Sequence, residues 1–167
     1  MSEIDLIRET ERLKRWLDRM ETNEPLPIAC RVYNDANFTH NSTGNWLAIT
    51  FNSERWDTTG MHEGVTNPSR ITFALGGWYL VGGNIVFAAN DTGIRGCAVR
   101  LGGSTYIGMK TQTNSGASTT VHITISILYY FAATNYVELM GFQDSGGNLN
   151  INTYGNYSLE FWAIRMA

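Results

Sequence analysis

The residues best suited to chemistry in this 167-residue chain are three histidines, two cysteines and scattered carboxylates. A metal site built on histidines needs them clustered at short spacings, but His40, His62 and His122 lie far apart. The sequence contains no Gly-x-Ser-x-Gly element, no phosphate-binding glycine loop and no Cys-x-x-Cys pair. We therefore expect no enzyme activity and no metal or other cofactor.

One predicted loop does gather ligand-type side chains. Asp57, His62 and Glu63 share it and could hold a cation, although ordinary polar loop residues are the simpler interpretation. Glycoside hydrolysis would need a facing pair of carboxylates. The other candidates sit on different predicted turns or strands and show no pairing signal: Asp91, Asp144 and Glu160.

Composition excludes several classes of function. A net charge of −3 gives no electrostatic attraction to nucleic acid. No run of about 18 apolar residues is present, so we expect no membrane span. The N-terminus is charged and lacks an apolar core, so we expect no secretory signal. For Cys30 and Cys97, reduced core thiols are favoured over a disulfide, and the sequence leaves their redox state open.

Residues 1–21 predict an amphipathic helix, since they hold 11 of the 27 charged residues and no Gly or Pro. Apolar residues follow a heptad-like spacing, and at about 2.5 heptads such a helix is marginal alone. The helix either packs on its own β-domain, bundles several copies as a short coiled coil, or docks on a partner. Residues 22–27 form a linker that contains Pro25 and Pro27. The predicted seam consists of Leu6, Leu13, Trp16, Leu17 and Met20.

Residues 28–167 predict one all-β domain. The clearest alternation runs from Val121 to Phe131, with His122, Thr124 and Ser126 on the polar face. Glycine- and Asn-rich turns separate the runs, and no helix is expected after residue 21. About nine or ten strands suit an antiparallel sandwich. The expected strands fall near 28–33, 47–51, 71–75, 79–87, 97–101, 105–109, 121–131, 136–143, 149–153 and 158–166.

Several short motifs in this domain resemble the C1q/TNF-like jelly roll, in the form found in bacteriophage structural proteins such as capsid decoration and head-fibre proteins. The family's usual Gly-Asp before the Tyr-Val strand is replaced by Thr134-Asn135, so that turn is expected to differ. The resemblance implies a trimer packed through one sheet of each jelly roll, and it carries no catalytic residues. The motifs are Ile49-Thr50-Phe51, Trp56-Asp57, Gly60-Met61, Asn67-Pro68-Ser69, Ile71-Thr72-Phe73, Gly77-Trp78-Tyr79-Leu80, Arg100-Leu101-Gly102-Gly103, Tyr136-Val137-Glu138-Leu139 and Phe161-Trp162.

The chain carries more large aromatics than one sandwich interior holds. A subunit interface is the favoured use for them, and stacking on a sugar is the rival. Tyr154 and Tyr157 belong to the same surplus. The predicted interface aromatics are Tyr129, Tyr130, Tyr136 and Trp162.

Together these features favour a non-enzymatic structural protein of a virion, made in the host cytoplasm. In this hypothesis a homotrimer attaches to the capsid or another virion protein through the helix and projects the jelly roll, as a capsid decoration or head-fibre protein. The alternative is the receptor- or glycan-binding tip of a tail fibre or spike. The short helix counts against a fibre, which usually needs a long shaft, although another protein could supply one.

Overall fold

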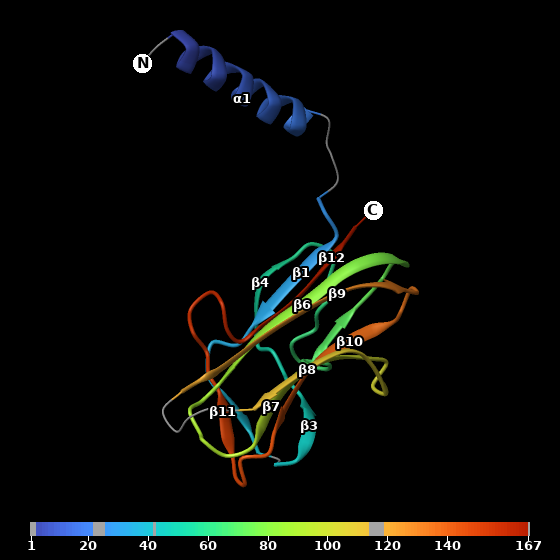
Figure 1. The fold of residues 1–167 in the computed structure, drawn as a ribbon. Coiled ribbons are helices and arrows are strands. Elements are labelled where there is room, and N and C mark those ends of the chain that lie inside the picture. The colour runs from blue at the N-terminus through green and yellow to red at the C-terminus, as the bar shows by residue number, and fades with distance from the viewer. Residues whose placement is uncertain (1–2, 22–25, 42, 114–118, 167) are drawn as a thin grey trace.

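The computed structural model describes residues 3–21, 26–41, 43–113 and 119–166, and the helix side chains only from Asp5 to Arg15. In these ranges the chain forms α1 (Glu3–Glu21) and then two antiparallel sheets (Figure 1). The predicted antiparallel sandwich preceded by one short helix is therefore confirmed. The helix as described is too polar to cross a membrane.

The first sheet, sheet A, has the strand order β2-β11-β6-β12-β1-β4, and β9 pairs with β6. The pairing of β6 with β9 is long and regular, from Gly77 opposite Phe131 to Phe87 opposite Val121. Its strands are β1 (Ala29–Tyr33), β2 (Phe38–His40), β4 (Ser53–Asp57), β6 (Gly77–Phe87), β9 (Val121–Phe131), β11 (Leu149–Ile151) and β12 (Glu160–Arg165).

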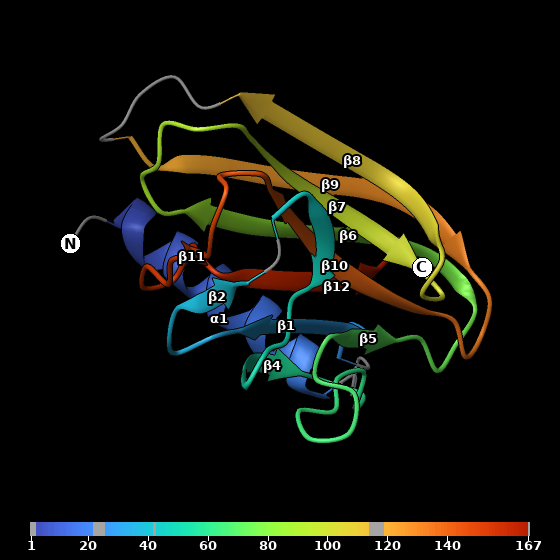
Figure 2. The same cartoon turned by 90° about the horizontal axis from the view of Figure 1, so that it is seen from below.

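The second sheet, sheet B, has the order β3-β10-β7-β8, and β5 also pairs with β10. At one side of the sandwich, β9 of sheet A lies beside β8 of sheet B (Figure 2). Gly102 and Gly103 both adopt left-handed backbone angles, which favours glycine in the tight β7–β8 turn. The strands of sheet B are β3 (Asn45–Ala48), β5 (Arg70–Thr72), β7 (Ile94–Leu101), β8 (Thr105–Thr113) and β10 (Tyr136–Gln143).

The core lies between the sheets and is rich in aromatic rings. Phe73 stacks on Phe131 with ring centroids 4.2 Å apart, and Phe51 stacks on Phe161 at 5.9 Å. The alternation predicted for β9 is observed, because Val121, Ile123 and Ile125 are buried while the residues between them face outward. This core fixes which side of each sheet faces outward.

Two strands lie where the sequence predicted loops. The polar segments 34–45 and 56–69 predict loops from their sequence, yet β2 lies in the first and the end of β4 reaches into the second. Both strands lie at the ends of the sheet A order. Short strands at a sheet edge carry little alternation, since only one neighbour and little core constrain their side chains.

Candidate interaction surface

The outward side of sheet A carries a group of exposed and partly exposed apolar side chains, here called the aromatic face. Strand register brings them together: Trp78 lies opposite Tyr130, Leu80 lies opposite Leu128, and Ile164 lies on the other side of Leu80. Trp78, Leu128 and Tyr130 are each more than half exposed. The aromatic face consists of Trp56, Trp78, Leu80, Leu128, Tyr130, Trp162 and Ile164.

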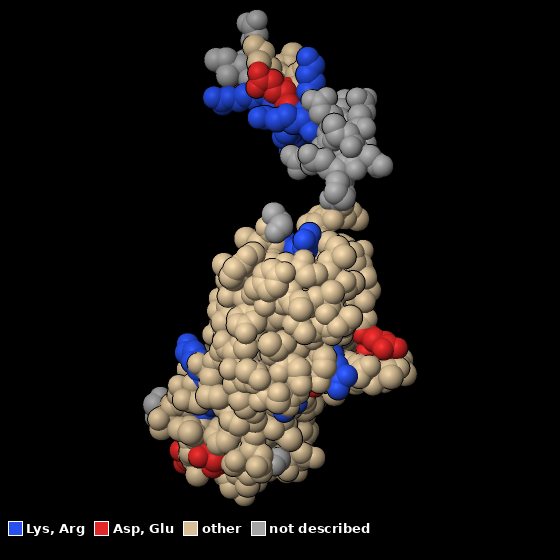
Figure 3. All heavy atoms as spheres, turned by 90° about the vertical axis from the view of Figure 1, so that its right-hand side faces the viewer, with Lys and Arg blue, Asp and Glu red and all other residues tan. Residues whose placement is uncertain are grey.

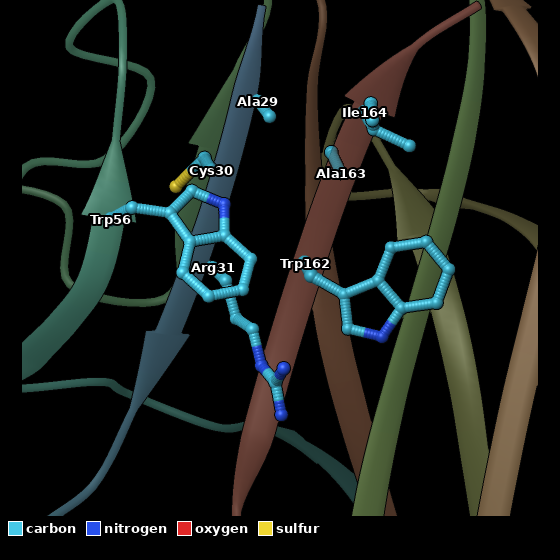
Figure 4. A pocket seen from close by; sticks show the side chains of 7 residues that line it. All are labelled: Ala29, Cys30, Arg31, Trp56, Trp162, Ala163 and Ile164. Carbon is cyan, nitrogen blue, oxygen red and sulfur yellow. The ribbon is translucent and has the colours of Figure 1, made fainter. Parts of the chain in front are cut away.

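A shallow groove of about 180 Å³ lies in one half of this face. In Figure 4, the indole rings of Trp56 from β4 and Trp162 from β12 stand on its two sides, with Arg31 of β1 between them. The Arg31 guanidinium lies over the Trp56 ring, 5.3 Å from its centroid. Ala29 keeps the floor low because its side chain is small. The groove is therefore apolar at its walls, with a fixed cation between them.

Trp162 can lie flat on sheet A because its neighbour on β6 is Gly82. A Cβ atom built on Gly82 would stand 2.4 Å from the Trp162 ring and 2.7 Å from the carbonyl oxygen of Ile125. Such distances are far below van der Waals contact. The missing side chain thus sets the position of the indole and the shape of the groove.

A buried ion-pair cluster fixes Arg31 beneath the groove. The Glu160 side chain is fully buried and accepts hydrogen bonds from the Nε atoms of Arg31 and, at 3.2 Å, Arg55. The same two guanidinium groups donate to backbone oxygens, Arg31 to Asn156 at 2.9 Å and Arg55 to Gly155 at 2.7 Å. These ion pairs and hydrogen bonds offset the free-energy cost of burying the Glu160 carboxylate. The cluster also ties the segment 152–159 to sheet A.

The predicted interface aromatics do not lie on one surface. Tyr130 and Trp162 belong to the aromatic face, whereas Tyr129 is on the inward side of β9, with its ring 5.1 Å from that of Phe131. Tyr136 belongs to sheet B, where the Arg70 guanidinium lies 4.0 Å from its ring centroid. Their role at an interface stays a prediction.

Sequence reasoning missed Trp56, Trp78 and Leu128 as surface partners. A signal for Trp78 was present, because β6 is apolar at both alternating sets: Tyr79 and Val81 point inward while Trp78 and Leu80 point outward. A strand that is apolar on both faces is usually covered on both. Trp56 had no such signal, because it lies in a short strand of mostly polar and charged residues.

The helix seam is exposed as far as the structure describes it. Leu6 and Leu13 are about half exposed, and every side chain from Asp5 to Arg15 faces solvent. This part of α1 therefore packs against no strand of its own chain, and in Figure 1 the helix lies apart from the sheets. The remaining seam side chains, those of Trp16, Leu17 and Met20, lie outside the described side chains.

The candidate cation ligands are used to hold their own loop. Asp57 accepts the backbone N–H groups of Thr59 and, at 2.8 Å, His62. The His62 ring lies 3.1 Å from a Glu54 carboxylate oxygen, and Glu63 accepts a hydrogen bond from Thr66. Among the described residues, no three His, Cys, Asp or Glu side chains are placed to hold a metal ion.

Both cysteines are free and buried, one in each sheet. Burial raises the pKa of Cys97 to about 12. Burial, and after it the negative charge of Asp57, also raises the pKa of Cys30. Neither thiol is therefore prepared to act as a nucleophile at neutral pH.

Comparison with known proteins defines the fold. No family model matches the chain, and no curated protein matches it by sequence. Among solved structures, an Eiger TNF from S. frugiperda is similar, with a TM-score of 0.64 at 11% identity over 84% of this chain and 94% of that one. The globular domain of zebrafish complement 1qA matches with a TM-score of 0.59 at 12% identity, over 84% and 98%. Murine APRIL matches with a TM-score of 0.62 at 7% identity, over 83% and 98%.

The chain therefore folds as a TNF/C1q-like jelly roll, as its motifs predicted. At identities of 7 to 12% this similarity defines the fold and nothing finer.

Proposed function

We propose that this chain is a non-enzymatic structural protein that assembles as a homotrimer through the aromatic face. The observation that carries the proposal is the exposure of Trp56, Trp78, Leu128 and Tyr130 on one outward face of sheet A. Large apolar patches on a single chain are usually covered by a partner. The described β-domain shown in Figure 3 also carries few charged side chains on the visible face, in contrast to the helix.

The shape of the aromatic face supports a ring of copies rather than a two-fold dimer. Its two halves differ, because Trp78, Leu128 and Tyr130 stand out near β9 while Trp56 and Trp162 border a groove at β1. A raised surface on one copy and a groove on the next make a heterologous contact, which generates a ring when the rotation between copies closes. The resemblance to C1q/TNF-like jelly rolls supports three as the number of copies.

The exposed helix fits the same assembly. Three copies of α1 could pack through Leu6, Leu13, Trp16, Leu17 and Met20 around the axis of the head. A coiled coil this short is marginal by itself, so the jelly rolls would supply most of the stability. If the helices instead stay separate, they can dock on another protein.

We further propose that the trimer belongs to a virion, as a capsid decoration or head-fibre protein that binds the shell and projects its jelly roll. The resemblance of the motifs to bacteriophage jelly rolls supports this role. The alternative, a receptor-binding tip of a tail fibre, uses the same head with a different attachment.

The mass of the full-length protein by light scattering tests the assembly, together with the double variant Leu6→Asp, Leu13→Asp. If the parent protein and the double variant are both trimers, the main contact lies in the jelly roll, and the helix is free to bind another protein. A trimer only with the intact seam makes α1 the main contact. A monomer at all concentrations overturns the homotrimer.

Immunogold labelling of the virus particles tests the virion role. Label distributed over the capsid is the expected result. Label confined to the tail tip would favour the receptor-binding alternative, and particles without label would overturn the virion role.

A further inference from the structure

A small pocket lies on the outward side of sheet A, at the opposite end of β6 from Trp78. It has a volume of about 140 Å³. From Trp78 to Asn84 is six residues, or about 20 Å along a strand, so the pocket is separate from the most exposed part of the aromatic face. We call it the tyrosine pocket. The side chains that line it are those of Asn84, Val86, His122, Thr124 and Tyr157.

Strand register builds the floor of the tyrosine pocket. Asn84 lies directly opposite Thr124, and Val86 lies opposite His122. All four are at outward positions of the β6–β9 pair, and Val86 is nonetheless 2% exposed. The floor therefore combines one covered apolar side chain with an amide, a hydroxyl and an imidazole.

Tyr157 comes from the segment between β11 and β12 and brings an aromatic ring to this floor. Its ring is nearly parallel to that of His122, with centroids 6.4 Å apart, and to that of Tyr154, at 5.8 Å. Half of the Tyr157 side chain remains exposed. The rings thus present a flat apolar surface that the chain itself does not cover.

The segment that carries Tyr157 is held in place before any ligand binds. Arg31 and Arg55 donate to the backbone oxygens of Asn156 and Gly155, and both are anchored on the buried Glu160. The Tyr154 N–H also donates to the oxygen of Ser158 at 2.7 Å. A ligand would therefore meet a largely preformed site, which lowers the entropy lost on binding.

The polar groups of the pocket are available to a ligand. The side chains of Asn84 and Thr124 make no hydrogen bond to any other described residue, and the His122 ring hydrogen-bonds among these residues only to the Thr120 hydroxyl, at 3.0 Å. An Asn amide offers two donors and one acceptor, and a Thr hydroxyl offers both roles. No Asp, Glu, Lys or Arg lines the pocket, so its lining holds no permanently charged side chain.

We propose that the tyrosine pocket binds one neutral sugar ring of a glycan. A pyranose has an apolar C–H face, which suits the Tyr157 ring, and an edge of hydroxyl groups, which suits Asn84 and Thr124. The volume of the pocket also suits a single sugar ring. Pockets for drug-sized ligands measure roughly 300–1,000 Å³, whereas this one measures about 140 Å³ and therefore suits a smaller molecule. The proposal goes beyond the structural role, and it rests on the proposed assembly leaving this end of sheet A uncovered.

Saturation-transfer NMR of the full-length protein tests this with methyl glycosides of glucose, galactose, mannose and N-acetylglucosamine. We expect at least one to bind with a Kd of the order of 1 mM, and to shift the His122 imidazole signals. Saturation should be strongest at the protons of one ring face. Absence of binding by all four, or binding only by sialic or glucuronic acid, overturns the proposal.

Two variants test whether the sugar binds in the tyrosine pocket. Asn84→Ala and Thr124→Val should each raise the Kd about tenfold, as expected for one lost hydrogen bond. Ser126→Ala is the matched control, because Ser126 is exposed on the same side of β9 but does not line the pocket. An unchanged Kd in both pocket variants would contradict the assignment.

The same variants separate this proposal from the proposed assembly. Asn84 and Thr124 make no hydrogen bond to other described side chains, so their variants should keep the Tm and the mass by light scattering of the parent protein. Loss of sugar binding without a change of mass supports the sugar site and leaves the proposed assembly unaffected. A change of mass in the Asn84→Ala protein would instead link the pocket to the contact between copies and overturn its assignment as a sugar site.

Discussion

The outward faces of the two sheets share one feature but differ in how exposed their aromatic side chains are. Each has a tryptophan lying on a glycine, Trp162 on Gly82 in sheet A and Trp46 on Gly96 in sheet B. In sheet B the Trp46 ring packs against two further rings, those of Tyr106 at 5.6 Å and Phe142 at 5.2 Å. Trp46 and Phe142 are thereby partly buried, and Tyr106 stays 40% exposed.

In sheet A the corresponding ring pair, Trp78 with Tyr130 at 5.8 Å, leaves both rings more than half exposed. Trp56 is 47% exposed and Trp78 is 53% exposed, and a groove stays open beside Trp162. Sheet A therefore exposes apolar area that a neighbouring molecule can cover, while sheet B has already buried much of its own. The difference indicates which face is used for assembly.

A buried glutamate between two arginines lies in both sheets. Glu160 is held by Arg31 and Arg55 in sheet A, with its side chain fully buried. In sheet B, Glu138 is bound by Arg100 at 2.7 Å, and Arg70 stands further away at 3.9 Å. The sheet A cluster is thus the more enclosed of the two and also anchors the segment carrying Tyr157.

The largest expected effect comes from removing these carboxylates. Glu160→Ala should lower the free energy of unfolding by about 3 kcal/mol or more, because two arginines lose a buried counter-charge. Glu138→Ala should cost about 1–2 kcal/mol, since its Arg70 contact is longer and more exposed. Urea unfolding at one fixed protein concentration measures both. Equal losses would mean that the two clusters do not differ as described.

The next effect concerns assembly and uses one exposed apolar residue from each sheet. Leu128 in sheet A is 58% exposed and Met109 in sheet B is 52% exposed, so either can become Asp without disturbing the core. Leu128→Asp should weaken association by about 2 kcal/mol, roughly 30-fold in Kd. Met109→Asp should leave it unchanged. Light scattering over a dilution series gives both values, and dissociation by Met109→Asp would assign assembly to sheet B.

A smaller effect is expected from filling the space below each tryptophan. Gly82→Ala should destabilise the fold by about 1–2 kcal/mol, because its Cβ meets both the Trp162 ring and a backbone oxygen. Gly96→Ala should cost less, since its Cβ meets only side chains, the nearest being Trp46 at 2.7 Å. Thermal unfolding compares them, and tryptophan fluorescence reports whether the Trp162 ring moves. A greater loss for Gly96→Ala would contradict the rigid floor of sheet A.

The last comparison has no effect at neutral pH, because it concerns the two thiols of the core behind the sheets. Cys30 in sheet A and Cys97 in sheet B have a raised pKa from burial, whereas an unfolded thiol keeps its ordinary value of 9.0. The unfolded state therefore loses these protons first as the pH rises. Stability should be unaffected by the thiols below pH 9 and should fall above it, towards about pH 12 for Cys97, by up to about 1.4 kcal/mol per pH unit for each thiol.

Thiol labelling checks this directly. Neither cysteine should react with a disulfide reagent at pH 8 in the folded protein, and both should react after unfolding. Replacing each with Ala should flatten the stability profile above pH 9. Fast labelling of only one thiol in the native state would show that the core is open behind that sheet.

Much of the fold follows from local patterns. Val121–Phe131 alternates so regularly that β9 was predicted with its observed ends, and Tyr136–Gln143 likewise. The missed strands, β2 and β4, lie at the two ends of sheet A. Their sequences, Phe38–His40 and Ser53–Asp57, are short or charged, and only pairing with distant strands makes them extended.

The surface was less predictable than the fold, as Trp162 illustrates. Its type and its place in the last strand were visible in the sequence, but the groove beside it needs Arg31, Trp56 and Gly82 from three other strands. Asn84 and Tyr157 meet in the same way across 73 residues. No local periodicity in the sequence predicts such contacts between distant residues.

The sequence by itself determined the helix, the alternating strands, their turns and the apolar side of each strand. These properties depend on neighbours one to four residues away, whose spacing is fixed by the backbone. The tertiary structure alone decided that sheet B covers its own aromatics while sheet A leaves a groove and a polar pocket open. The physical reason is that strand order and register arise from contacts between distant segments, and these settle only when the whole core packs.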